Sequence, residues 1–388
     1  MSESATMSDE VVAGDSRVID LEQFDELIRA LNERFDVRGP VLSHDAIVLG
    51  PLRGARDLPV GWRDEQAPGH YRVRDDGDDE YFGFAVGPSS VKAQFLPPHQ
   101  VQWRSEGRGE HLKFVEATPA PVDLAFVGVR PCDVAALDVL AQVLVGGEYP
   151  DPRVVNSRRG LFVAVVDCAR PAATCFCSSM GTGPDARGGY DLAITELFAP
   201  HRFLVRLGSE RGRREMATVA SVPATDHDWD ERRATLAAAE ARLTRHVDTR
   251  DLATFLEGSI DHPRWRDIAE RCLSCANCTM ACPTCFCTDV RDVTDVDGDT
   301  ERQRSWSSCF DLNYSFVHGG PVRSSTSSRY RQWLTHKFST WWDQFGSSGC
   351  VGCGKCVTWC PVGIDVTAEL AALRAASARE TSPGVGTT

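Results

Sequence analysis

Lysine is scarce in this chain of 388 residues, and long apolar runs and an export signal are missing. Four lysines occur among 42 cationic side chains, the other 38 being arginine, and we attribute this bias to genomic base composition. No run approaches the roughly 18 apolar residues of a membrane helix. The polar, acidic start MSESATMSDEVVAGDSRVID lacks the basic flank and apolar stretch of a signal peptide. We therefore predict a cytoplasmic protein without a membrane segment.

Positive charge is outweighed along the whole chain. The formal net charge is −13 at pH 7, whereas nucleic acids and anionic membranes require a basic surface that displaces counterions. Neither is expected as a partner. With 42% hydrophobic and 25% charged residues, the composition is that of a folded globular protein, and the length predicts two or three domains.

Cysteine is abundant, with fifteen in the chain. A reducing cytoplasm disfavours disulfides, so metal ligation or redox chemistry is the better reason to keep so many thiols. Eleven of them lie within residues 272 to 360. The other four lie in the first half of the chain and are Cys132, Cys168, Cys175 and Cys177.

The first half of the chain alternates helical and β-prone segments. We predict disordered tails at residues 1–17 and 376–388 because both are small and polar. Between them, residues 18–225 predict a mixed α/β domain. DLEQFDELIRALNERF favours a helix capped by Asp20, and DVAALDVLAQVLVGG favours another. Six runs are β-prone and read DAIVLG, HYRVRDD, YFGFAVG, DLAFVGVR, LFVAVVD and FLVRLGS.

Residues 226–375 predict a second domain that is mostly helical and has no comparable strand. Its helical segments are DERRATLAAAEARLTRHV, DLATFLEGS, HPRWRDIAERC and AELAALRAASA. The predicted fold class is thus α+β, with an N-terminal mixed α/β domain followed by a helical, two-cluster ferredoxin-like domain. A long insertion at residues 283–349 interrupts the second domain.

Two motifs give the strongest signal for function. CLSCANCTMACP and CVGCGKCVTWCP both have the C-x2-C-x2-C-x3-C-P spacing of a bacterial ferredoxin half-site, in which the fourth cysteine ligates the other cluster. This rule predicts two [4Fe-4S] clusters with crossed ligands. The first set is Cys272, Cys275, Cys278 and Cys360, and the second is Cys350, Cys353, Cys356 and Cys282.

Zinc is the alternative to iron and sulfur at these motifs. Zinc sites use separated cysteine pairs or mix cysteine with histidine, which does not describe a three-cysteine run with a trailing Cys-Pro, twice. Crossed ligation additionally requires the 67 residues between Cys282 and Cys350 to fold back so that the half-sites meet. Within that insertion, SSRYRQWLTHKFSTWWDQF interleaves cations and tryptophans. We interpret it as cover for the anionic clusters, with partner docking and nucleic-acid binding as alternatives.

Longer stretches resemble a known family. RPCDVAALDVL, DCARPAATCFCSSMGTGPD, CLSCANCTMACPTCFC, HGGPVRSSTSSRYRQWLTHK and GCVGCGKCVTWCPVGIDVT are similar to the iron-sulfur β subunit of cytoplasmic [NiFe] sulfhydrogenases and NAD(P)-linked hydrogenases. An iron-sulfur subunit of anaerobic sulfite reductase belongs to the same family. The resemblance spans about residues 20 to 375. Ala276 and Lys355 stand where the family pattern has Gly and Arg, which affects the surroundings of the clusters and leaves their ligands in place.

The resemblance implies a non-catalytic electron-transfer subunit with two [4Fe-4S] clusters. Its implied partners are a flavin subunit that reacts with NAD(P) and the small and large subunits of a [NiFe] hydrogenase. Two alternatives stay open. The chain could serve a sulfite or polysulfide reductase, or it could be a scaffold whose clusters are structural.

Seven cysteines are left after the two clusters. Cys132, Cys168, Cys175 and Cys177 fall at predicted strand ends, where loops can converge, so they are candidates for a third iron-sulfur cluster; a zinc site and plain packing are the alternatives. The segment Thr-Cys-Phe-Cys occurs at 174–177 and again at 284–287. For the second copy, Cys285 and Cys287, together with Cys309, we favour packing and sulfur hydrogen bonding around a cluster, with a joint metal site as the alternative.

Overall fold

The computed structural model describes residues 16–117 and 123–380. The predicted tails lie mostly outside this range. Strand β1 (Ser16–Ile19) already includes the last two residues of the predicted N-terminal tail. At the other end, helix α14 (Val366–Glu380) extends into the predicted C-terminal tail.

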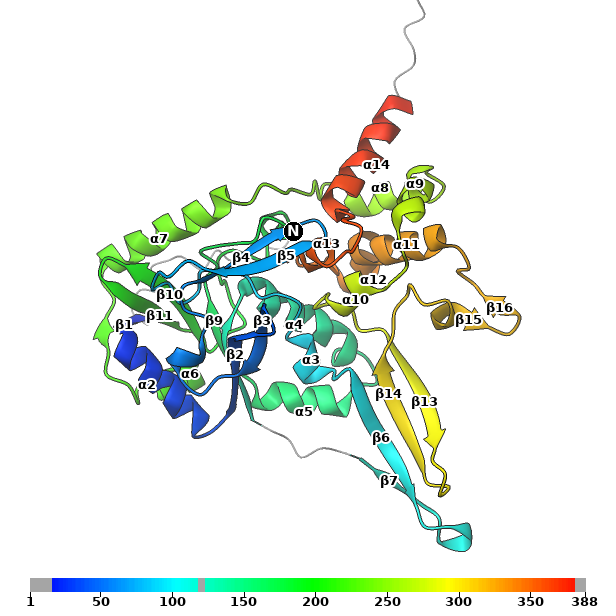
Figure 1. Ribbon diagram of the computed structural model, residues 1–388, viewed down its shortest axis with the longest axis horizontal. Helices are drawn as coiled ribbons and strands as arrows, with labels where there is room; N and C mark the ends of the chain where they lie inside the picture. The colour runs from blue at the N-terminus through cyan, green and yellow to red at the C-terminus, as the bar shows by residue number, and fades with distance from the viewer. Residues whose placement is uncertain (1–15, 118–122, 381–388) are drawn as a thin grey trace, which may run out of the picture.

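An eight-stranded mixed sheet forms the body of the first half (Figure 1). Its four central strands, β10, β9, β8 and β2, run parallel, and the outer pairs are antiparallel. β8 and β9 are buried along their whole length, as expected for parallel strands covered on both faces. In spatial order the strands are β12 (Val222–Pro223), β1, β11 (His201–Leu207), β10 (Leu192–Phe198), β9 (Phe162–Val166), β8 (Leu124–Val129), β2 (Asp36–Ser43) and β3 (Ala46–Pro51).

Helices cover both faces of this sheet. Helix α2 (Leu21–Asn32) begins with the predicted Asp20 cap and buries Phe24 and Leu27 against one face. Helix α4 (Pro131–Leu144) packs against the opposite face through Val134 and Leu137. The predicted α/β character of this half is confirmed. The remaining helices here are α3 (Lys92–Phe95), α5 (Pro152–Gly160) and α6 (Glu210–Met216).

One predicted strand in this half is wrong. Residues 81–87, YFGFAVG, have no regular structure because side chains satisfy their backbone. The Glu196 carboxylate accepts from the backbone N–H groups of Tyr81 and Phe82 at 2.7 and 3.0 Å. Arg130 Nη2 donates to the carbonyls of Phe82 and Phe84 at 2.9 and 2.6 Å. These bonds replace the ladder of a sheet.

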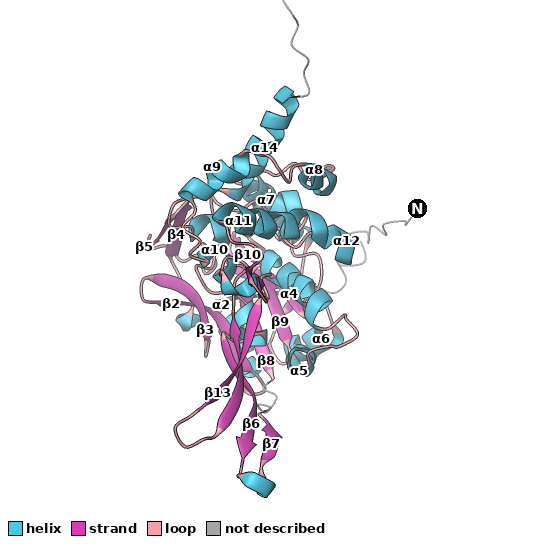
Figure 2. Cartoon of the chain, turned by 90° about the vertical axis from the view of Figure 1, so that its right-hand side faces the viewer, coloured by secondary structure: helices cyan, strands magenta, loops and turns pink. Residues whose placement is uncertain are grey.

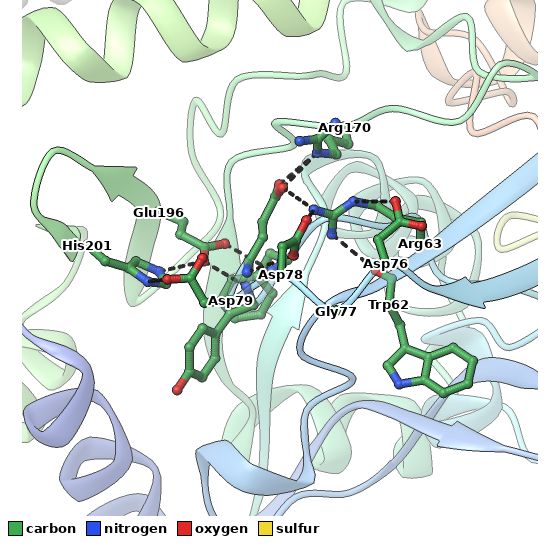
Figure 3. A network of polar contacts seen from close by, with 12 residues as sticks. Trp62, Arg63, Asp76, Gly77, Asp78, Asp79, Arg170, Glu196 and His201 are labelled. Atoms are coloured by element: carbon green, nitrogen blue, oxygen red, sulfur yellow. Dashed lines mark hydrogen bonds and ion pairs between the residues drawn. The ribbon is translucent and has the colours of Figure 1, made fainter.

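A network of charged side chains fixes the start of this irregular segment (Figure 3). Glu80 accepts from Arg63 Nη2 at 2.7 Å and from Arg170 Nε at 2.8 Å. His201 Nε2 lies 2.8 Å from Glu196 Oε1, and this hydrogen bond raises the pKa of His201. The network therefore links the loop after β9, which carries Arg170, to the sheet.

The second half is mainly helical, as predicted, around a core that includes Trp265, Tyr330 and Trp333. Helices α11 and α12 are joined by a π-helical turn at His336–Thr340. The helices are α7 (Asp226–Ala241), α8 (Leu252–Gly258), α9 (Arg264–Arg271), α10 (Asn277–Met280), α11 (Thr326–Thr335), α12 (Trp341–Phe345), α13 (Lys355–Thr358) and α14.

The expectation of no strand after residue 225 is wrong. β13 (Thr288–Thr294) and β14 (Thr300–Trp306) form a hairpin around an Asp297-Gly298 turn, in which Gly298 has φ +86°. The hairpin joins β6 (His99–Glu106) and β7 (Lys113–Glu116) from the first half in one four-stranded sheet. Figures 1 and 2 show this sheet extending away from the body. Many of the residues along β13 and β14 are charged, so the sequence lacks the alternation of apolar and polar residues that would have predicted these strands.

Short elements complete the fold. Strands β4 (Trp62–Ala67) and β5 (His70–Asp75) form one hairpin, and β15 (Phe316–Val317) and β16 (Gly320–Pro321) form another. Single 3-10 turns lie at Ala55–Asp57, Gly109–His111, Cys177–Met180 and Asn313–Ser315.

Candidate iron-sulfur centres

The two ferredoxin-type loops have the same backbone conformation. In the first loop Ser274 and Ala276 have φ +51° and +66°, and in the second Gly352 and Gly354 have φ +64° and +70°. A one-turn helix, α10 or α13, follows each loop. Glycine adopts this left-handed conformation freely, whereas Ala276 does so at a cost of roughly 1–2 kcal/mol. The left-handed backbone gives a physical reason for the glycine that the resemblance leads one to expect at this position.

The first predicted set of thiols surrounds one cavity. Cys272 caps the end of helix α9, Cys275 follows in the loop, Cys278 lies in helix α10, and Cys360 arrives from the second half-site after helix α13. The other lining residues are mainly apolar and include Tyr330, Trp333, Ile364 and Val366. The insertion thus folds back far enough to bring Cys360 to the loop of the first motif.

The second predicted set surrounds a neighbouring cavity. Cys350 and Cys353 line it from their loop, Cys356 lines it from helix α13, and Cys282 reaches it from the first motif. Cys356 and Trp333 line both cavities. The two cysteine sets therefore stand side by side, and each is completed by a cysteine from the other half-site.

Buried hydrogen-bond donors without partners point to what these cavities hold. Tyr330 and Trp333 are 3% and 5% exposed, yet Tyr330 Oη and Trp333 Nε1 have no hydrogen-bond partner in the part of the chain that the structure describes. Both residues line the first cavity. A buried unpaired donor is costly, and sulfur atoms of a cluster are acceptors that donors of this kind tune. The residues present fit an iron-sulfur cluster.

Lys337 supplies positive charge at the second cavity. It is 4% exposed, and its Nζ donates to Thr284 Oγ1 at 2.8 Å and to the Gly349 carbonyl at 3.2 Å. Burial acts to lower the pKa of Lys337, but the thiols of Cys282, Cys285 and Cys350 outweigh it and raise that pKa. The segment around Lys337 was predicted to cover the clusters, and Lys337 itself lines the cavity.

Two further lysines are buried where the two halves of the chain meet. Lys355 Nζ donates to the carbonyls of Val86, Gly87 and Ser89 at 2.7 to 2.9 Å. Lys92 Nζ lies 3.9 Å from the centre of the Trp306 ring. Burial lowers the pKa of Lys92, and the neighbouring thiols of Cys285, Cys282 and Cys287 act to raise it. Lysine is scarce in the sequence, but three of its four positions lie at this junction.

The quartet from the first half also comes together. Cys175 and Cys177 are buried in one apolar cluster, and Cys132 packs against it. Cys168 is buried as well, at 8% exposure, and it is among the thiols that raise the pKa of Cys175 and Cys177 beyond the effect of burial. Gly183 approaches this group closely, since a Cβ there would lie 3.2 Å from Cys177 Sγ.

The last three cysteines take part in two thiol–thiol contacts, one of which is with Cys282 of the second set. Cys285 contacts Cys282, and Cys309 donates to the sulfur of Cys287, which lowers the pKa of Cys287 to about 6. Packing and sulfur hydrogen bonding around a cluster stays a prediction for these three cysteines. Among the described residues, no three His, Cys, Asp or Glu side chains are arranged to hold a single metal ion. In a cubane cluster each of the four cysteine sulfurs binds a different iron, so these sulfurs lie farther apart than the ligands of one metal ion do. The absence of a single-ion arrangement in the described part of the chain therefore does not conflict with cluster binding.

The first cavity approaches the surface at one edge. Cys275 is exposed, and the adjacent Leu273 and Val362 are 63% and 39% exposed. Cys275 also borders an open groove of about 890 Å³ that runs along residues 303–313. The thiols of the second set are buried or half-buried. Access from outside is therefore greatest at the first set.

Sequence reasoning missed several residues of the site. Lys92 lies far from the cysteine motifs in sequence and reaches them only through the fold, whereas Arg130 stands two residues before Cys132 and was not singled out. Tyr330 stood inside a segment recognised for its cations and tryptophans. The scarcity of lysine is the signal that could have drawn attention to Lys92.

The fold and the thiol-lined cavities define an iron-sulfur protein of the two-cluster ferredoxin class. A profile of the 4Fe-4S dicluster domain matches residues 271–364, which contain both half-sites. No helix in the described residues is long and apolar enough to cross a membrane.

The chain is 30% identical over 283 residues to sulfhydrogenase 2 subunit beta of Pyrococcus furiosus, an alignment that covers 70% of this chain and 80% of that protein. The chain belongs to the family of sulfhydrogenase β subunits. No solved structure matches it.

Proposed function

We propose that this chain relays single electrons within an oxidoreductase complex through two [4Fe-4S] clusters. One cluster is held by Cys272, Cys275, Cys278 and Cys360, and the other by Cys350, Cys353, Cys356 and Cys282. The observation that carries the proposal is that the two cysteine-lined cavities share Cys356 and Trp333. Iron-sulfur clusters supply one-electron transfer without forming or breaking bonds to a substrate.

The surrounding residues have separate tasks in this proposal. The crossed cysteines hold the two half-sites together, so that neither set is complete without the other. Lys337 offsets the negative charge of the second set, and the hydroxyl of Tyr330, which lines the first cavity, is left free to donate to a cluster sulfur. The exposed edge at Cys275 and Leu273 is where a redox partner can approach most closely.

The proposed partners are a flavin subunit that reacts with NAD(P) and the subunits of a [NiFe] hydrogenase. Family membership and the name of the Pyrococcus relative support this choice. A flavin accepts a hydride as an electron pair and releases its electrons singly, which matches a protein that conducts electrons one at a time. Sulfite or polysulfide reduction is the second candidate, because the same family includes an iron-sulfur subunit of anaerobic sulfite reductase.

Two measurements test the proposal. An anaerobic reductive titration of the native complex, followed by electron paramagnetic resonance, should show both clusters accepting electrons from the physiological reductant. Clusters that stay oxidised while the complex turns over would refute a relay and support a structural scaffold. Proteins that co-purify identify the terminal reaction. A companion with four [NiFe]-ligating cysteines supports the hydrogenase, and a siroheme subunit supports the sulfite reductase.

A further inference from the structure

Four cysteines converge at one edge of the eight-stranded sheet, outside the dicluster domain. Strands β8 and β9 are parallel neighbours, so their carboxyl ends meet at the same edge, where ligand sites of open sheets form. Cys132 is the second residue of α4, directly after β8, and Cys168 follows β9 by two residues. Cys175 and Cys177 come from the loop after Cys168.

Burial of these thiols is nearly complete. Cys168, Cys175 and Cys177 are 8%, 8% and 4% exposed, and Cys132 is half-buried against Cys175 and Cys177. Cys168 and Cys177 act to raise the pKa of Cys175, and Cys175 and Cys177 act to raise that of Cys132. Single buried cysteines are ordinary core residues, but four that converge from two separate chain segments have the makings of a ligand set.

A buried cation with unused donors faces this set. Arg130 is 3% exposed and lies over the rings of Phe82 and Phe84 at 5.6 and 5.3 Å. Its Nη2 is bonded to two backbone carbonyls, whereas Nε and Nη1 have no partner and no carboxylate forms an ion pair with it among the described residues. Arg130 is the positive charge acting on the Cys168 thiol. A buried guanidinium in this state requires an anionic group nearby.

Arg130 acts through space to lower the pKa of the Asp64 carboxyl, but no carboxylate at this edge forms an ion pair with Arg130 among the described residues. Asp133 accepts from the backbone N–H of Arg130 at 3.1 Å, and Asp64 accepts from Ala85 and Gln66. Asp167 is engaged by other arginines. All three act to raise the pKa of Cys168, so the thiol group lies among negative charges, with Arg130 opposing them.

The loop of this quartet lies directly on the second ferredoxin-type loop. The backbone N–H of Phe176 donates to the Gly352 carbonyl at 2.8 Å, and Cys175 Sγ lies 3.6 Å from the Cys353 carbonyl. Only glycine fits at this approach. A Cβ on Gly354 would stand 2.4 Å from the Thr174 carbonyl.

We propose that Cys132, Cys168, Cys175 and Cys177 hold a third iron-sulfur centre of the [4Fe-4S] class, with Arg130 as its buried counter-cation. The centre stands in series with the second and first cysteine sets and ends at the exposed Cys275. This inference rests on the proposed relay function and extends it into the first half of the chain. It also explains the first Thr-Cys-Phe-Cys segment, whose two cysteines supply adjacent ligands.

Metal analysis of the anaerobically purified full chain is the first test. Three [4Fe-4S] centres require at least about twelve irons per chain, and Cys168→Ala or Cys175→Ala should each contain about four fewer and lose one paramagnetic species. Ser178→Ala, in the same loop, is the matched control and should keep all irons. About eight irons in the wild-type chain, or eight with one zinc, would overturn the third centre. Because two reducible species would remain, the relay proposal would survive that result.

Arg130 variants test its role as counter-cation through the reduction potential of the third centre, which depends on the charge of Arg130 and not only on its packing. Arg130→Met should shift the potential of the third species to a more negative value and leave the other two in place, whereas Arg130→Lys should restore most of the shift. The iron content of both variants is measured first. Full iron with an unchanged potential in Arg130→Met would overturn the assignment of Arg130, and loss of four irons in that variant alone would support it.

Discussion

Replacing Lys337 by Met should lower the reduction potential of the second cluster. Lys337 Nζ lies 2.8 Å from Thr284 Oγ1, which is 3.3 Å from Cys282 Sγ, so the charge is at most about 6 Å from a ligand sulfur. At an effective dielectric constant of 20, two unit charges at this separation interact by roughly 2–3 kcal/mol. Since 59 mV corresponds to about 1.4 kcal/mol for one electron, the expected shift is on the order of 100 mV.

The sign and the site of the shift distinguish this cause from others. Removing a cation makes it harder to add an electron, so the potential becomes more negative, and burial of Lys337 at 4% exposure leaves little solvent to screen the effect. Redox titration followed by electron paramagnetic resonance measures it. Lys337→Arg keeps the charge and should stay near the wild-type potential. Lys113→Met removes a charge from the exposed strand β7 and should change nothing.

Two outcomes would refute the reasoning. A Lys337→Met chain with full iron content and an unchanged potential would mean that the ammonium is not felt by the cluster. An equal shift of the potential in Lys113→Met would mean that the potential responds to the net charge of the chain and not to the local position of Lys337.

Three further predictions concern backbone and pH. Ala276→Gly should raise the free energy of unfolding by about 1 kcal/mol because it removes a left-handed alanine, and denaturant unfolding would show no gain if that strain were absent. Gly354→Ala should destabilise the chain more than Gly346→Ala does, because both have positive φ but only the first would clash with a carbonyl; equal melting temperatures would contradict the contact. The hydrogen bond to Glu196 raises the pKa of His201 above 6.5, so its stabilisation is complete below about pH 6.5 and is lost as pH rises through the folded-state pKa. His201→Gln should therefore flatten the decline of the unfolding midpoint on the alkaline side, and an unchanged pH profile would contradict it.

The sequence was most informative where local chemistry determines structure. Cysteine spacing led to the expectation that Cys360 lies with the thiols of the first motif and Cys282 with those of the second, and the cavity linings have this arrangement, with Cys356 lining both cavities. The Asp20 cap and the apolar face of α2 were likewise readable, since both depend on residues within one or two turns.

Long-range contacts account for what the sequence did not indicate. Strand β14 pairs with β6 across about two hundred residues, and no local pattern encodes such a partner. The segment at 81–87 has β-prone residues, but Glu196 and Arg130 compete for its backbone groups. Local propensity was overridden in both places by residues distant in sequence.

Crossed ligation is the central claim, and paired alanine variants test it most directly. Cys275→Ala serves as the reference for loss of the first cluster, and Cys353→Ala serves as the reference for loss of the second. Each variant is characterised by paramagnetic resonance of the reduced chain and by its iron content. The account predicts that the spectrum of Cys360→Ala matches that of Cys275→Ala, although Cys360 belongs to the second motif. A Cys360→Ala spectrum that matches Cys353→Ala would contradict it, because each motif would then hold its own cluster.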